Sequence, residues 1–201
     1  MSFPASSHGH AKPHRLALFA SGSGSNAQRL MEHFQGHPSI EVALVVCNKP
    51  GAGVIARAEH FGIPVLLIER ERFLRGDAYL RELQATHITY IVLAGFLWRV
   101  PAPLISAYEN RIVNIHPALL PAYGGKGMWG EHVHAAVLAS GDAESGITIH
   151  YVDEHYDHGA HLFQARCPVL PGDTPATLAA RVLELEHRHF AGVVERAVLE
   201  S

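Results

Sequence analysis

Short apolar segments alternate with amphipathic segments along most of the chain, and this alternation restricts the possible folds more than any other feature of the sequence. Segments 40–47 and 89–95 are almost continuously apolar, as parallel strands buried on both faces of a sheet should be. Segment 77–85 instead spaces its apolar residues for one face of a helix. We therefore predict an α/β fold with a single Rossmann-like open twisted sheet, mostly parallel with an antiparallel part, and with helices on both faces.

The same periodicities give the order of the elements. Strands are predicted at 15–20, 40–47, 64–68, 89–95, 111–115, 146–152 and 161–169, and the fourth, being the most apolar, is expected at the centre. Helices are predicted at 27–34, 53–61, 77–85, 101–108, 131–139 and 174–200, with Gly192 as a candidate interruption of the last. In such sheets, ligands bind beyond the carboxyl ends of the strands.

Composition fits one globular domain and disfavours several classes of protein. Hydrophobic residues make up 48% of the 201 residues, so we expect one domain over 15–201 after a flexible tail at 1–14. A formal net charge of -3 gives no reason to expect a nucleic-acid partner. The sequence has no apolar stretch that could span a bilayer and no secretory signal, so we expect no membrane partner and a cytoplasmic location. Cys47 and Cys167 are interpreted as buried free thiols.

A glycine-rich loop, Ser21-Gly-Ser-Gly-Ser-Asn26, joins the first predicted strand to the first predicted helix. Glycines let the backbone approach an anion closely, and the start of a helix favours a phosphate group. The third glycine of the dinucleotide-binding pattern is replaced by Ala27. Taken alone, the loop fits a phosphate site and a simple turn equally well.

Two polar residues stand at the end of the fifth predicted strand. Asn114 and His116 are two positions apart, so they project from the same face of that strand at the ligand-binding edge. An amide and a protonated imidazole can both donate hydrogen bonds to a developing oxyanion. Asp157, in a polar segment after the sixth strand, is a candidate carboxylate for raising the pKa of His116. A structural histidine and a turn aspartate are the alternatives.

Four segments, in this order and spacing, resemble the folate-dependent formyltransferases: Leu-Ala-Gly-Phe at 93–96, Asn-Ile-His-Pro-Ala-Leu-Leu-Pro at 114–121, Gly-Ile-Thr-Ile-His-Tyr-Val at 146–152 and Asp-His-Gly at 157–159. The resemblance covers about 15–190, and the glycine-rich loop is similar to that of the glycinamide ribonucleotide branch. It implies transfer of the formyl group of 10-formyltetrahydrofolate to the primary amine of glycinamide ribonucleotide, in de novo purine biosynthesis. The products would be formylated glycinamide ribonucleotide and tetrahydrofolate.

The resemblance also implies roles for individual residues, and it implies no metal. Asn114, His116 and Asp157 match the catalytic trio. The residues that match the ribonucleotide site are Gly24, Ser25 and Asn26 around the phosphate and Glu186 at the ribose hydroxyls. The residues that match the folate site are Leu97, Trp98, Arg99, Val100, Asn114, Asp153, Glu154, His155, Tyr156 and Asp157. His150 matches a family histidine near the trio.

The chain also departs from the family pattern. Trp98 stands where an arginine is common, Gly76 stands where a folate-contacting arginine can occur, and Leu183 replaces a polar residue near the phosphate. The loop 122–130 is longer than the common form. We expect this loop to be a mobile flap in which Lys126 supplies the positive charge that Leu183 cannot, the alternative being a fixed surface loop.

Three other functions fit parts of the pattern. A methionyl-transfer-RNA formyltransferase normally adds a C-terminal β-barrel, whereas this chain ends on a predicted helix and has a negative net charge. A formyltetrahydrofolate hydrolase usually has an N-terminal regulatory domain, for which the first 14 residues are too few. A nucleotide-binding module without activity would not need the trio. We expect small-molecule substrates only, and a monomer or a homodimer.

Overall fold

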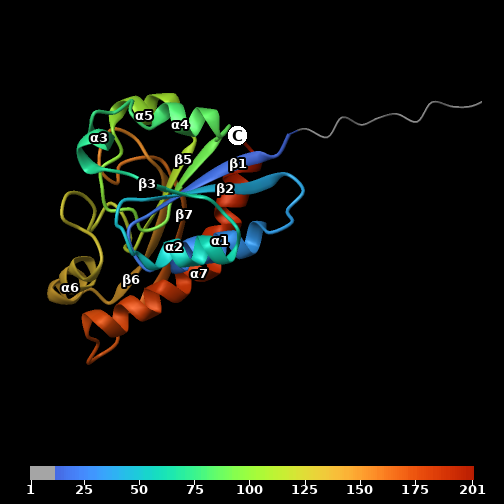
Figure 1. The fold of residues 1–201 in the computed structure, drawn as a ribbon. Helices are drawn as coiled ribbons and strands as arrows, with labels where there is room; N and C mark the ends of the chain where they lie inside the picture. Colours follow the sequence, from blue (N-terminus) through green and yellow to red (C-terminus); the bar gives the residue numbers. More distant parts are fainter. Residues whose placement is uncertain (1–11) are drawn as a thin grey trace, which may run out of the picture.

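The computed structural model describes residues 12–201, so the first 11 residues of the predicted tail lie outside the described part. Seven strands form one sheet in the order β3-β2-β1-β4-β5-β6-β7, with β4 at its centre as predicted (Figure 1). Strands β6 and β7 are antiparallel to their neighbours, and the remaining pairs are parallel. The strands are β1 His14–Ala20, β2 Ile40–Cys47, β3 Val65–Leu67, β4 Tyr90–Leu93, β5 Ile112–His116, β6 Glu144–Tyr151 and β7 His161–Pro168.

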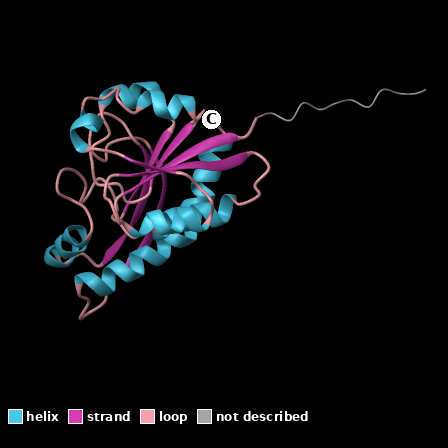
Figure 2. Ribbon diagram, in the orientation of Figure 1, coloured by secondary structure: helices cyan, strands magenta, loops and turns pink. Residues whose placement is uncertain are grey.

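Helices cover both faces of the sheet, which confirms the predicted fold class (Figure 2). One face carries α1 Ser25–Phe34, α2 Gly53–His60 and α7 Pro175–Leu199, while α6 Glu131–Ser140 packs against α7. The other face carries α3 Arg70–Leu74, α4 Leu80–Ala85 and α5 Ala102–Ala107. Helix α3 was not predicted, because five residues are too few to show a helical period. Helix α7 runs through Gly192 without interruption.

Strand β1 illustrates why the central strands are apolar on both sides. Leu16 and Leu18 pack with residues of α1 and α7, whereas Ala17 and Phe19 belong to the core on the opposite face. All four side chains are buried, since successive residues of a strand point to opposite faces. The continuous apolar run in the sequence is therefore the consequence of two separate cores.

The antiparallel part of the sheet leaves no room for a side chain at residue 146. A Cβ at Gly146 would lie 2.0 Å from the carbonyl oxygen of Ala165 on the neighbouring strand β7. Atoms cannot approach that closely, so any larger residue must displace the backbone of β6 or β7. Glycine at this position is thus required by the strand pairing next to β5.

We predict that Gly146→Ala lowers the free energy of unfolding by about 1–3 kcal/mol, because the added methyl group overpacks a backbone contact. Gly192→Ala is the matched control: it lies inside α7 with no atom within 4 Å of the added Cβ. That variant should gain about 0.5–1 kcal/mol from higher helix propensity. Urea unfolding of both variants measures the difference, and equal stabilities would contradict the steric account.

Candidate active site

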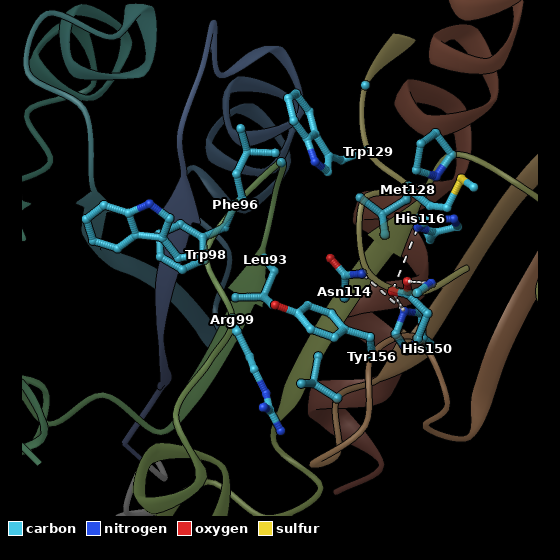
Figure 3. A pocket seen from close by; sticks show the side chains of 18 of the residues that line it. Leu93, Phe96, Trp98, Arg99, Asn114, His116, Met128, Trp129, His150 and Tyr156 are labelled. Atoms are coloured by element: carbon cyan, nitrogen blue, oxygen red, sulfur yellow. Dashed lines mark hydrogen bonds and ion pairs between the residues drawn. The ribbon is translucent and has the colours of Figure 1, made fainter. Parts of the chain in front are cut away.

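A cavity of about 800 Å³ opens beyond the carboxyl ends of β4 and β5. Its walls come from the segment after β4, from β5, from the loop 122–130 before α6, from the segment after β6 and from α7. Figure 3 shows Asn114, His116 and His150 close together, with Trp98 and Arg99 on the segment after β4. The sheet therefore brings together residues that are widely separated in the sequence, at the edge where such sheets bind ligands.

Asn114 and His116 both line this cavity from β5, as their spacing predicted. His116 is buried, and its Nε2 lies 2.8 Å from the carbonyl oxygen of Tyr123. A carbonyl oxygen can only accept, so Nε2 carries a hydrogen and donates this bond. In the neutral ring, Nδ1 is consequently the unprotonated nitrogen. It lies 3.8 Å from Oδ1 of Asp157.

Asp157 joins the two histidines of the site. Its Oδ1 lies 3.6 Å from Nε2 of His150 and 3.8 Å from Nδ1 of His116, and its Oδ2 accepts the backbone N–H of Gly125 at 2.7 Å. Burial acts to raise the pKa of Asp157, but His150, the Gly125 N–H and His116 outweigh it and hold the pKa below its ordinary value. The carboxylate is therefore charged at neutral pH.

The pKa of His116 departs from the sequence-based expectation. Burial lowers the pKa of His116, and this effect exceeds the upward effects of Asp157 and of the Tyr123 carbonyl. Asp157 thus raises the pKa of His116, as predicted, but by less than burial lowers it. The net pKa lies below the ordinary value of histidine, so His116 is mostly neutral at pH 7 in the free protein.

His150, which the family resemblance placed near the trio, belongs to the same group. It pairs with Asn114 in the antiparallel register of β5 and β6. Its Nδ1–H donates to the carbonyl oxygen of Tyr151 at 2.7 Å, which leaves Nε2 to accept from Nδ2 of Asn114 at 3.1 Å. Asn114 makes no other side-chain hydrogen bond within 12–201, so its second N–H remains available in the cavity.

Two of the four predicted ribonucleotide residues, Asn26 and Glu186, meet at one end of the cavity. Nδ2 of Asn26 donates to Oε2 of Glu186 at 2.6 Å, across 160 residues of sequence. Both residues are buried, and burial raises the pKa of Glu186. Gly24 and Ser25 do not line the cavity. Gly24 has φ +77° and packs against α2, where a Cβ would lie 2.6 Å from Cβ of Val54.

The two predicted folate segments face the same cavity. Leu97 to Val100 line it from one side and Asp153 to Asp157 from another. Arg99 connects them, since its Nη2 donates to the carbonyl oxygen of Glu154 at 2.7 Å and its guanidinium lies 5.7 Å from the ring centre of Tyr156. Trp98 packs against Phe73 of α3 and against Phe96, which follows β4.

Some lining residues were missed in the sequence. Arg70 lines the cavity from α3. At Gly76, where an arginine of the family can occur, no side chain fits, because a Cβ would lie 2.7 Å from Pro103. His134 lines it from α6; it is buried and its Nδ1 has no partner within 12–201. Burial and His116 lower the pKa of His134. No sequence motif indicated Arg70 or His134, because their positions depend on how α3 and α6 pack.

Within residues 12–201, no group of three or more histidine, cysteine, aspartate or glutamate side chains is arranged to hold a metal ion. Cys47 and Cys167 are buried free thiols, as predicted. None of the helices in this part of the chain is long and apolar enough to cross a membrane.

Several known proteins are similar to this chain over most of its length. Phosphoribosylglycinamide formyltransferase, chloroplastic, is 45% identical to this chain in Vigna unguiculata and 42% identical in Arabidopsis thaliana, over 90% of this chain in both cases. The chain spans 60% and 64% of the lengths of these two relatives.

Solved structures of phosphoribosylglycinamide formyltransferases match the fold over nearly their whole length. The Bacillus halodurans structure has a TM-score of 0.82 and 36% identity, over 90% of this chain and 94% of that one. The Brucella melitensis structure has a TM-score of 0.82 and 38% identity, over 92% of this chain and 96% of that one. The profile of the formyl transferase family matches residues 14–194. The resemblance seen in the sequence is thereby confirmed, and the chain belongs to the formyl transferase family.

Proposed function

We propose that this protein transfers the formyl group of 10-formyltetrahydrofolate to the primary amine of glycinamide ribonucleotide, in de novo purine biosynthesis. The proposal depends above all on one observation: a single cavity contains Asn114, His116 and Asp157, with the Asn26–Glu186 pair at one end. The names of the relatives support the same substrates. Formylated glycinamide ribonucleotide and tetrahydrofolate would be the products.

In the proposed reaction, the unprotonated amine attacks the formyl carbon directly, with no enzyme nucleophile. The free N–H of Asn114 and a proton on Nδ1 of His116 would donate to the formyl oxygen as it gains negative charge. Burial disfavours that proton in the empty site, whereas Asp157 and the charge developing on the oxygen favour it. Asp157 would also help to move a proton, through water, from the amine to the folate nitrogen. The bond between that nitrogen and the formyl carbon then breaks, and tetrahydrofolate leaves.

The proposed binding sites divide the cavity between the two substrates. Glu186 would accept hydrogen bonds from the ribose hydroxyls, close to Asn26, and the phosphate would extend past the lining of the cavity to the loop of Gly24, Ser25 and Asn26. The folate ring system would lie between Leu97–Val100 and Asp153–Asp157, where apolar side chains and the carboxylates of the second segment are both present. No metal takes part in this proposal.

We further propose that residues 15–201 act as one formyltransferase domain in the cytoplasm, as a monomer or a homodimer. The single continuous sheet supports one domain, and the two buried free thiols fit a reducing compartment. Sedimentation equilibrium would measure the oligomeric state, and microscopy of a tagged protein would test the location.

The decisive experiment is a spectroscopic assay of folate turnover with and without glycinamide ribonucleotide. We expect tetrahydrofolate to accumulate only when the amine is present, with formylated product in equal amount. Release of formate without the amine would instead indicate a hydrolase, and no turnover under either condition would indicate a binding protein.

We predict that His116→Ala reduces kcat by roughly 10²-fold or more, because one hydrogen-bond donor to the oxyanion is lost. Circular dichroism should show a folded variant. His60→Ala, an exposed histidine at the end of α2, is the control and should retain full activity. Near-normal turnover by a folded His116→Ala variant would exclude this residue from the mechanism.

We predict that Asp157→Asn lowers kcat by roughly 10²-fold and moves the alkaline limb of its pH profile to lower pH. The sign follows from the charges. The Asp157 carboxylate raises the pKa of His116, so an uncharged amide lets that pKa fall further. The protonated imidazole is then lost at a lower pH. A profile of unchanged height and shape would refute the pairing of these two residues.

We predict that Lys126→Ala raises KM for glycinamide ribonucleotide several-fold with little change in kcat, because Lys126 lines the cavity while Leu183 offers no charge to a phosphate. Lys12→Ala, before the amino end of β1, is the control. Fluorescence of Trp129, isolated by Trp98→Phe, should respond to the ribonucleotide if the loop moves. An unchanged KM together with unchanged fluorescence would make the loop a fixed connection.

A further inference from the structure

The first residues of the loop 122–130 contact both ionisable residues of the proposed trio through the backbone. The carbonyl oxygen of Tyr123 accepts from Nε2 of His116 at 2.8 Å. Two residues later, the N–H of Gly125 donates to Oδ2 of Asp157 at 2.7 Å. Any movement of this short segment would therefore change the hydrogen bonds of His116 and Asp157 together.

Tyr123 adopts an unfavourable backbone conformation to make this contact. Its φ is +56°, in the left-handed region, which is energetically costly for a residue with a Cβ. Glycine would avoid that cost, and the next two positions, 124 and 125, are glycines. A strained conformation persists only where the surrounding structure imposes it. The contacts of residue 123 must therefore hold this conformation in place.

The tyrosine hydroxyl makes two of these contacts. It donates to Oδ2 of Asp142 and also lies 2.5 Å from Oγ of Ser140, at the C-terminal end of α6 and just beyond it. Ser140 in turn donates to the carbonyl oxygen of Val137 within α6. The carboxylate of Asp142 raises the pKa of the Tyr123 phenol, so the phenol remains protonated and able to donate. The Tyr123 hydroxyl thus connects the start of the loop 122–130 to the end of α6, and α6 packs on α7.

We propose that Tyr123 is a positioning residue: its hydroxyl, attached to Asp142 and Ser140, holds its carbonyl against Nε2 of His116 and so directs Nδ1 toward Asp157 and the cavity. Without the carbonyl, the neutral imidazole could place its hydrogen on either nitrogen. With it, Nδ1 is the nitrogen that gains and loses the proton. This inference rests on the proposed formyl transfer for its kinetic test, but its structural test does not require activity.

Tyr123→Phe removes the hydroxyl and keeps the ring that packs on the core. We expect a kcat about 3- to 10-fold lower, as for the loss of one hydrogen bond, with KM for both substrates unchanged. The His116–Tyr123 bond raises the pKa of His116, so weakening it should move the His116 titration to lower pH. Imidazole signals in NMR spectra, assigned with His116→Gln, measure this directly. The titratable groups near His116, namely Asp157, His150 and His134, are unchanged by the substitution.

Changes at Asp142 test the same attachment without altering the loop. Asp142→Ala should reproduce the shift in the His116 titration, whereas Asp142→Asn keeps an acceptor oxygen and should restore most of the wild-type behaviour. Tyr108→Phe is the control for loss of a tyrosine hydroxyl away from the cavity, since Tyr108 donates to the carbonyl oxygen of Ile88 on the other face of the sheet. It should affect stability alone.

An unshifted His116 titration in both Tyr123→Phe and Asp142→Ala would overturn the proposal, even if both variants were less stable. A shift of equal size in Tyr108→Phe would also overturn it, because the effect would then be a general loss of stability. If the wild-type protein transfers no formyl group to glycinamide ribonucleotide, the proposed function fails, while the NMR titration still decides the role of Tyr123.

Discussion

The antiparallel pairing of β6 with β5 is the interaction on which the proposed site depends. It places His150 opposite Asn114, and it leads the chain from the end of β6 back to the cavity at Asp157. On its other side, β6 packs tightly against β7, because Gly146 lies directly against the backbone of β7 and Gly159 against that of β6. Strands β1 to β5 run parallel and bring their carboxyl ends to this edge, whereas β6 runs past β5 in the opposite direction. The reversal of direction adds a histidine and a carboxylate to them.

Burial and charge oppose each other throughout this group. The same desolvation that makes each hydrogen bond stronger also disfavours a proton on His116 and a charge on Asp157. Asp157 remains ionised because the N–H of Gly125 donates to its Oδ2, and a positive charge on His116 would favour the carboxylate further. The carboxylate of Asp157 and the carbonyl of Tyr123 raise the pKa of His116, but burial lowers it by more. The site thus holds a proton acceptor whose state is sensitive to any further negative charge in the cavity.

The sequence predicted the architecture well because the apolar periodicities report directly on burial. The bounds of β2 agree with the prediction at both ends, and the central place of β4 followed from its apolar character. Asn114 and His116 could be placed on one face from strand geometry alone. The net pKa of His116 could not be predicted, because it depends on how much of the ring is desolvated. The role of Tyr123 was equally hidden, since it involves a backbone carbonyl that every residue possesses.

The hydrogen bond between Asn26 and Glu186 has a consequence for the synthesis of the protein. The ribosome makes Asn26 160 residues before Glu186, and α7 supplies the wall that completes that end of the cavity. The first strands and helices can pair as they emerge, since domains begin to fold from the N-terminal side during translation. Until α7 docks, however, Asn26 faces solvent and the cavity lacks one side. A nascent or truncated chain can therefore possess most of the sheet and still be unable to enclose a substrate.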